Sequence, residues 1–276
     1  MSSPRPRPSL SPCARCGASA FLRVAPVREH GQGGAPTPMA VGYATQKRQL
    51  GPFARAVACV GPAVESIAHG TFTIIVCRAC GDVRWYARDL ELVAPPSAAE
   101  VLEPAFESAT LGPCVDCGDA RALRVARMKT RGSGGQPSTL PVLRIASHRW
   151  GFATKRVAGH FSLFVCRSCA RCTWIAGGLE AIPALATHTR ETSPCRRCAT
   201  RTHLPVEPVD EDGATLRVLY DKLHAREIRV GRYALDICTG CGLTDWHAHD
   251  TATLEPDASL GVAWLEAGEG QEGPYR

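Results

Sequence analysis

Residues 70–85 read GTFTIIVCRACGDVRW, and the chain repeats this pattern two more times. The copies are GHFSLFVCRSCARCTW at residues 159–174 and GRYALDICTGCGLTDW at residues 231–246. Each copy joins an alternating apolar run to a C-x-x-C pair and places a tryptophan five residues after the second cysteine. An alternation of period two is typical of a strand with one buried face. The repeat therefore predicts three strands that each lead into a cysteine turn.

A second motif precedes each copy of the first. It reads CARCGASAFLRVAPV from Cys13, CVDCGDARALRVARM from Cys114 and CRRCATRTHLPVEPV from Cys195. All three place Gly or Ala after the second cysteine, a position where a small residue allows a tight turn. Two motifs that recur together in three places indicate a tandem triplication.

Cysteine usage points to metal binding. Of the 14 cysteines, 12 form six C-x-x-C pairs, and only Cys59 and Cys172 stand outside them. Two such turns brought together by a hairpin offer four thiolates to one tetrahedral ion. We expect Cys59 to be a packing residue. Cys172 is expected to be a small buried or half-exposed thiol just past the site, and the alternative is that it replaces Cys169 as the fourth ligand. The predicted metal ligands are Cys13, Cys16, Cys77, Cys80, Cys114, Cys117, Cys166, Cys169, Cys195, Cys198, Cys238 and Cys241.

Two other uses of C-x-x-C pairs fit the sequence less well. A thioredoxin-like redox pair requires a βαβ context and one pair per domain, whereas these pairs come in twos. A rubredoxin-like iron site uses a similar cysteine turn, and the spacing alone leaves it open. We therefore expect three structural Zn²⁺ ions as cofactors, with iron the less favoured metal.

The predicted fold is small, all-β and metal-stabilised: three tandem zinc ribbons, each an antiparallel sheet with two C-x-x-C turns. Trp85, Trp174 and Trp246 are expected to cover the small ribbon cores rather than to stack on bases. The Pro-rich linkers favour limited contact between the ribbons. The predicted organisation is a disordered N-terminal tail at 1–12, ribbons at 13–93, 114–182 and 195–254, linkers at 94–113 and 183–194, and an acidic C-terminal tail at 255–276.

The layout of each unit resembles a group of short bacterial zinc-ribbon proteins described as predicted nucleic-acid-binding proteins. The shared features are an opening C-x-x-C-G, a Gly-rich basic middle, a strand that ends in C-x-x-C-G, and an aromatic residue a few positions later. The second unit, CVDCG…SHRWGFATKRVAGHFSLFVCRSC…W, looks closest. This resemblance implies the ribbon fold, and it suggests nucleic acid as a ligand.

The charge distribution singles out the second unit. Lys and Arg outnumber Asp and Glu by 9 to 5 in residues 13–93 and by 11 to 3 in residues 114–182, but not in residues 195–254, where they number 8 against 9. Four thiolates around one Zn²⁺ carry a net negative charge, so only the second unit stays strongly basic. Basic and aromatic residues there suit phosphate contact and base stacking, although a solvated basic face fits equally. The candidate nucleic-acid contacts are Arg127, Lys129, Arg131, Arg149, Trp150, Lys155 and Arg156.

No catalytic constellation is evident in the sequence. It contains no P-loop, no G-x-G-x-x-G and no nucleophile paired with a base, and Cys₄ sites leave no open coordination position. We therefore expect no enzyme activity and no small-molecule substrate. The opening residues lack the apolar core of a signal peptide, and no run reaches the length of a membrane span. These features predict a cytoplasmic protein without membrane contact.

The leading hypothesis is a non-catalytic zinc-binding protein that binds DNA or RNA mainly through the basic second ribbon. The alternative is a protein–protein interaction scaffold built from metal-stapled modules. In that case the Gly/Pro-rich inserts of the first two units, such as residues 28–38, would carry the partner specificity.

Overall fold

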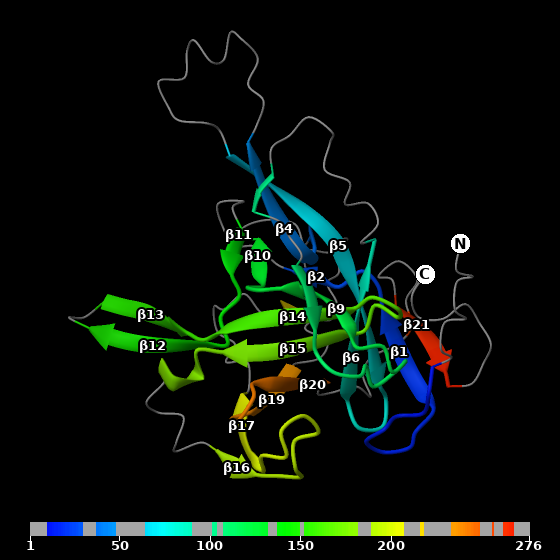
Figure 1. Cartoon of the computed structure of the whole chain (residues 1–276). Coiled ribbons are helices and arrows are strands. Elements are labelled where there is room, and N and C mark those ends of the chain that lie inside the picture. Colours follow the sequence, from blue (N-terminus) through cyan, green and yellow to red (C-terminus); the bar gives the residue numbers. More distant parts are fainter. Residues whose placement is uncertain are drawn as a thin grey trace.

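A computed structural model of the chain shows a protein built almost entirely of antiparallel strands (Figure 1). Within the described residues, the helical structure is a 3₁₀ turn at Leu179–Ala181. The prediction of a mostly β, antiparallel fold is thus confirmed. The structure describes residues 10–29, 37–47, 64–89, 101–103, 107–131, 137–149, 152–181, 189–206, 216–217, 233–248, 256 and 262–267.

The first unit has a sheet in which the repeat strand lies at the centre. Strand β5 (Val64–Cys77) pairs with β1 (Ala20–Val24) on one side and with β6 (Asp82–Arg88) on the other. This order brings the cysteine turn before β1 next to the turn between β5 and β6. The remaining strands of this part are β2 (Arg28–Glu29), β3 (Thr37–Pro38), β4 (Ala40–Lys47) and β7 (Val101–Glu103).

The second unit repeats this order with β9 (Arg121–Val125), β14 (His160–Cys166) and β15 (Cys172–Gly177). Between β9 and β14 lie two hairpins. The longer one, β12 with β13, extends away from the body as a two-stranded ribbon (Figure 1). The hairpin strands are β10 (Lys129–Arg131), β11 (Pro137–Thr139), β12 (Leu143–Arg149) and β13 (Phe152–Ala158).

The third unit has the same core of strands. β19 (Tyr233–Cys238) pairs with β17 (Thr202–Val206) and with β20 (Leu243–Ala248). A short strand, β18 (Leu216–Arg217), pairs with β2 of the first unit. The triplicated sequence therefore folds as three copies of one sheet order.

The three units close into a ring through their last strands. In each unit, the backbone N–H of one alanine donates a hydrogen bond to a backbone carbonyl of another unit. Ala87 of the first unit donates to the second unit at 2.9 Å, and Ala176 of the second unit donates to the third at 2.7 Å. Ala248 of the third unit donates to the first at 2.7 Å. The acceptors are the residues that follow the second cysteine pair: Ala170, Gly242 and Gly81. The expectation of limited contact between the units is therefore wrong. Unpaired N–H and C=O groups on the outer edge of each last strand find partners on the next unit.

Close backbone approach explains the glycines at these junctions. A Cβ at Gly81 or Gly242 would lie 2.0 or 1.9 Å from the carbonyl oxygen of the approaching unit. The junction between the first and second units has Ala170 in place of glycine, and its strands share one β-bridge, between Tyr86 and Arg171. The strands at the other two junctions each share two residue pairs. The ring thus has two closely paired junctions and one looser junction.

Four strands lie in stretches that the sequence suggested were linkers or tail: β7, which pairs with β4 of its own unit, and three edge strands that pair with the following unit. β8 (Glu107–Thr110) pairs with β9, β16 (Arg190–Glu191) with β17, and β21 (Val262–Glu266) with β1. Each comes from the segment that follows the preceding unit, so the segment after the third unit completes the sheet of the first. Leu10 and Ala267 contribute to one hydrophobic cluster beside this edge.

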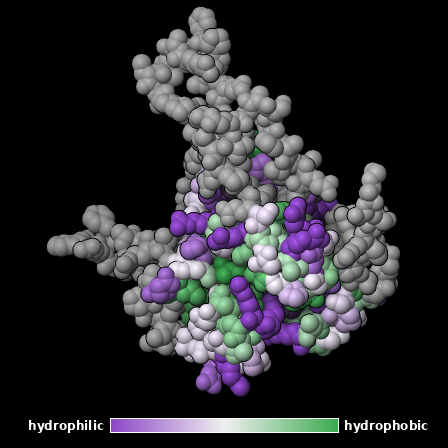
Figure 2. Space-filling view, in the orientation of Figure 1, coloured by the Kyte–Doolittle hydropathy of each residue, from purple (hydrophilic) through white to green (hydrophobic). Residues whose placement is uncertain are grey.

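The core of the ring is a cluster of the three repeat tryptophans. Trp85, Trp174 and Trp246 are 1, 2 and 5% exposed, and their ring centroids lie 5.0 to 5.2 Å apart. Phe72 and Phe161 each pack on the tryptophan of their own unit and on that of the next. The structural role of the tryptophans is confirmed, but they fill one shared core instead of three separate ones. Hydrophobic residues remain visible at the centre of the face viewed in Figure 2.

Because the three units share one core, a core substitution in one unit should destabilise all three. In the metal-loaded protein, Trp174→Ala should lower the free energy of unfolding by about 3–5 kcal/mol, because it leaves a cavity at the centre of the ring. Trp264→Ala, at a site 43% exposed, is the matched control and should cost less than about 1 kcal/mol. Urea denaturation followed by circular dichroism measures both. A second transition that Trp174→Ala leaves unmoved would show that the units fold independently.

The position of β21 predicts a role for the C-terminal segment in closing the ring. Removing residues 255–276 should expose the edge of β1, which now forms five residue pairs with β21, and an open edge promotes association between chains. We expect a lower urea midpoint and higher oligomers in size-exclusion chromatography. Removing only residues 268–276, which keeps β21, is the control. Equal behaviour of the two truncations would contradict this role.

Candidate metal centres

The twelve paired cysteines come together as three groups of four. Within each group all sulfur atoms lie within 4.8 Å of one another. The nearest Sγ–Sγ distances across each pair of turns are 3.5 to 3.7 Å. A tetrahedral ion with Zn–S bonds of about 2.3 Å has sulfur–sulfur edges of about 3.8 Å. The three groups therefore suit metal binding, one ion in each.

All six cysteine turns share one backbone conformation. In each, the residue after the second cysteine donates its N–H to the carbonyl of the first cysteine, over 2.7 to 2.9 Å. The φ angle of that residue lies between 59° and 75°, a left-handed conformation that glycine adopts without strain. Ala170 and Ala199 adopt it as well, with φ of 59°. The alanines thus keep the turn geometry and accept the unfavourable conformation.

The sulfur atoms are partly shielded from solvent. Cys77 and Cys238, which end the central strands β5 and β19, are fully buried, whereas Cys16 and Cys198 are exposed on the outer turns. Arg84, itself buried, donates to the carbonyls of Ser11 and Pro12 and so holds the segment that leads into the first turn. Each group is thus part of the fold.

Neighbouring thiols in a group affect one another's pKa. Hydrogen bonds from neighbouring cysteines lower the pKa of Cys114 to about 2, and the same contacts raise the pKa of Cys166 to about 11. A hydrogen bond with Thr200 lowers the pKa of Cys198 to about 6, whereas burial raises that of Cys241 to about 12. One thiol of a group loses its proton readily. Deprotonation of a second thiol is unfavourable without a cation, because the two negative charges repel each other. A divalent cation must therefore displace protons when it binds.

Cys172 lies outside the groups, as the sequence suggested. It is buried, its Sγ contacts the carbonyl of Ala170 at 3.6 Å, and burial raises its pKa. Cys59 falls outside the described residues. The second cysteine group therefore contains Cys169 and not Cys172. The sequence alone favoured this assignment without deciding it.

Polar contacts across the junctions were not evident from the sequence. The Tyr86 hydroxyl of the first unit donates to Asp116 of the second at 2.8 Å, and Arg171 lies within 3.7 Å of the same carboxylate. Burial raises the pKa of Tyr86 to about 12. Arg15 of the first unit contacts His247 of the third at 2.6 Å. These residues come from turns and strands far apart in the chain, so no local pattern connects them.

The candidate nucleic-acid residues fall into two places. Arg127 is exposed before β10, a strand that contains Lys129 and Arg131. The backbone positions of Arg149, Lys155 and Arg156 lie on the projecting ribbon of β12 and β13, and Trp150 lies outside the described residues.

Comparison with protein-family models, with curated proteins and with solved structures finds no match to this chain. The class is therefore defined by the structure itself: an all-β ring of three related units, each with a Cys₄ group suited to a metal ion. No helix in the described part of the chain has the length and hydrophobicity of a membrane span.

The position of Cys172 provides a direct test of the ligand assignment. Cys169→Ser should reduce the metal content from three ions per chain to two, because one site loses a thiolate. Cys172→Ser, the same change at another buried cysteine of the same unit, should leave three ions. Elemental analysis of the purified proteins measures this and identifies the metal. Three ions in Cys169→Ser with two in Cys172→Ser would reverse the assignment.

Proposed function

We propose that this protein is a non-catalytic zinc protein that binds DNA or RNA through the β12–β13 ribbon of the second unit. The observation that supports it is the ribbon itself, which projects from the metal-stapled body and bears basic residues (Figure 1). The resemblance of the second unit to nucleic-acid-binding zinc ribbons points the same way.

Zinc is the metal that the donor set favours. Four thiolates at tetrahedral spacing suit Zn²⁺ or iron, and no sequence feature calls for redox chemistry. A site closed by four cysteines stabilises a fold and leaves no position for substrate or water. The metal's role in this proposal is therefore structural: it holds the body from which the ribbon extends.

The ribbon has dimensions and residues that suit a nucleic acid. Seven residue pairs join its strands, which gives a length of roughly 20 Å. The major groove of B-DNA admits a two-stranded ribbon of this kind. In the pairing register Arg149 lies opposite Phe152, Lys155 opposite Ala146, and Arg156 opposite Ile145. Basic positions thus occur along the ribbon from its tip inward, where phosphates on either side of a groove would lie.

Neutralising the ribbon tests the proposal. The triple variant Arg149→Gln, Lys155→Gln, Arg156→Gln should bind a short DNA duplex or RNA hairpin at least tenfold more weakly at low salt. It should also reduce the slope of log K against log salt by about 3, roughly one for each lost phosphate contact. Fluorescence anisotropy at several salt concentrations measures both quantities.

A matched control places the same change elsewhere on the surface. Arg78, Arg167 and Arg201 are exposed arginines of the three units that lie outside the ribbon. Their triple change to Gln should alter affinity much less, although the net charge changes equally. Equal weakening by both triple variants would refute the ribbon as the interface. Absence of binding at low salt by the unchanged protein would refute nucleic-acid binding and favour the protein-scaffold alternative.

A further inference from the structure

The three junctions of the ring place different residues at the same two positions. One position is the third residue of the first cysteine turn, and the other follows the repeat tryptophan. At the junction of the third unit with the first they are Arg15 and His247, which are in contact. At the junction of the first unit with the second they are Asp116 and Tyr86, which form a hydrogen bond. Two junctions are thus closed by a polar pair.

The junction between the second and third units lacks such a pair. Here the two positions hold Ile175 and Arg197, and an isoleucine side chain cannot accept a hydrogen bond. Among the described residues, no hydrogen bond or ion pair of the Arg197 guanidinium is found, and its side chain is exposed. A guanidinium carries five donors in a planar fork that matches phosphate and carboxylate oxygens. This junction therefore presents a cation that is available to a ligand.

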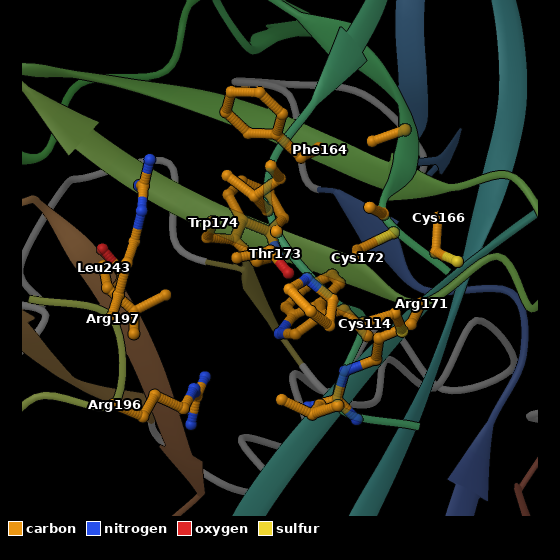
Figure 3. Close-up of a pocket in the computed structure, with 18 of the residues that line it drawn as sticks. Cys114, Phe164, Cys166, Arg171, Cys172, Thr173, Trp174, Arg196, Arg197 and Leu243 are labelled. Atoms are coloured by element: carbon orange, nitrogen blue, oxygen red, sulfur yellow. The ribbon is translucent and has the colours of Figure 1, made fainter. Parts of the chain in front are cut away.

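A cavity of about 310 Å³ lies beside this arginine, within the range of small-molecule sites. Figure 3 shows Arg196 and Arg197 on one side of it, with Phe164 and Trp174 on the other. The cavity lies between the cysteine turns of the second and third units and reaches the tryptophan cluster. A ligand here would contact both units.

Part of the lining is hydrophobic. It includes Leu111, Phe164 and Val115, a residue that is 66% exposed. Val115 and Trp264 are the exposed large hydrophobic residues of the described part, and Trp264 is stacked against the Arg78 guanidinium. Covering Val115 would remove apolar surface from water, which favours a ligand with an apolar group. Phe164 favours a flat aromatic one.

A second arginine lines the cavity, but it already has a partner. Arg196 contacts Asp245 at 2.8 Å, and Figure 3 shows its side chain pointing in a different direction from that of Arg197. Arg121 lies 2.9 Å from Asp119, and Arg171 lies 3.7 Å from Asp116. Arg197 is therefore the arginine of the lining that has no carboxylate partner among the described residues. Arginine–phosphate pairs are frequently bidentate, so its planar fork can hold a phosphate group by itself.

We propose that this cavity binds a phosphate ester with an aromatic group, the phosphate on Arg197 and the aromatic group against Phe164. A free nucleoside monophosphate and the phosphorylated end of an oligonucleotide share this chemistry. The site is separate from the β12–β13 ribbon and does not require the ribbon to bind nucleic acid.

The metal-loaded full-length protein and adenosine 5′-monophosphate test the proposal. Binding is followed by calorimetry and by tryptophan fluorescence, since three tryptophans line the cavity. Arg197→Ala should weaken binding at least tenfold. Arg15→Ala removes the equivalent arginine of the first unit and should leave the affinity unchanged. Metal content and urea midpoint of both variants establish that they remain folded.

Three comparisons decide the outcome. Adenosine without phosphate and inorganic phosphate alone should each bind at least tenfold more weakly than the monophosphate. Equal binding of either, equal effects of the two arginine variants, or no saturable binding of the monophosphate would overturn the proposal. A trinucleotide with a 5′ phosphate that binds more tightly than its unphosphorylated form, and depends on Arg197, would identify a nucleic-acid end as the source. Ribbon variants should not change any of these affinities.

Discussion

The ring depends on a hydrogen bond made three times, from the last strand of each unit to the cysteine turn of the next. Its acceptors, at Gly81, Ala170 and Gly242, are residues whose conformation the turn itself imposes. The cysteines of that turn place their sulfur atoms at the spacing of a metal site. A metal ion bound there would position more than its own ligands, because it would also orient the carbonyl on which the neighbouring unit docks. This backbone contact would couple the three sites to the ring.

The ring also solves a problem of size. A single unit has few large apolar residues, and such a small sheet buries too little surface to offset the entropy of ordering its chain. Trp85, Trp174 and Trp246 pack against one another and so form one core from three small ones. Metal ligation at the cysteine groups would add to the stability that the shared core provides at the centre of the ring.

Triplication keeps the fold and leaves individual positions free to diverge. The turn position that holds Arg15 in the first unit holds Asp116 in the second and Arg197 in the third. Two of these residues close their junctions, whereas the third lies beside a cavity. The projecting basic ribbon likewise belongs to the second unit. Differences between the copies, rather than the repeated residues, are where ligand binding is to be sought.

Spacing alone identified the cysteines, because C-x-x-C turns have to converge if four sulfurs are to share one ion, and period-two alternation identified β5, β14 and β19. The short edge strands β8, β16 and β21 gave no such signal, since they pair through backbone groups that every sequence carries. The same holds for the ring: Pro-rich linkers suggested separate ribbons, but the contacts between units join backbone atoms and tryptophans that are distant in the chain.

The sequence by itself determined the three metal-ligand groups and the strands that lead into them. Only the tertiary structure decided that the units share one core, that Cys172 stays outside its site and that Arg197 has no side-chain partner among the described residues and lies beside a cavity, because these depend on which surfaces meet.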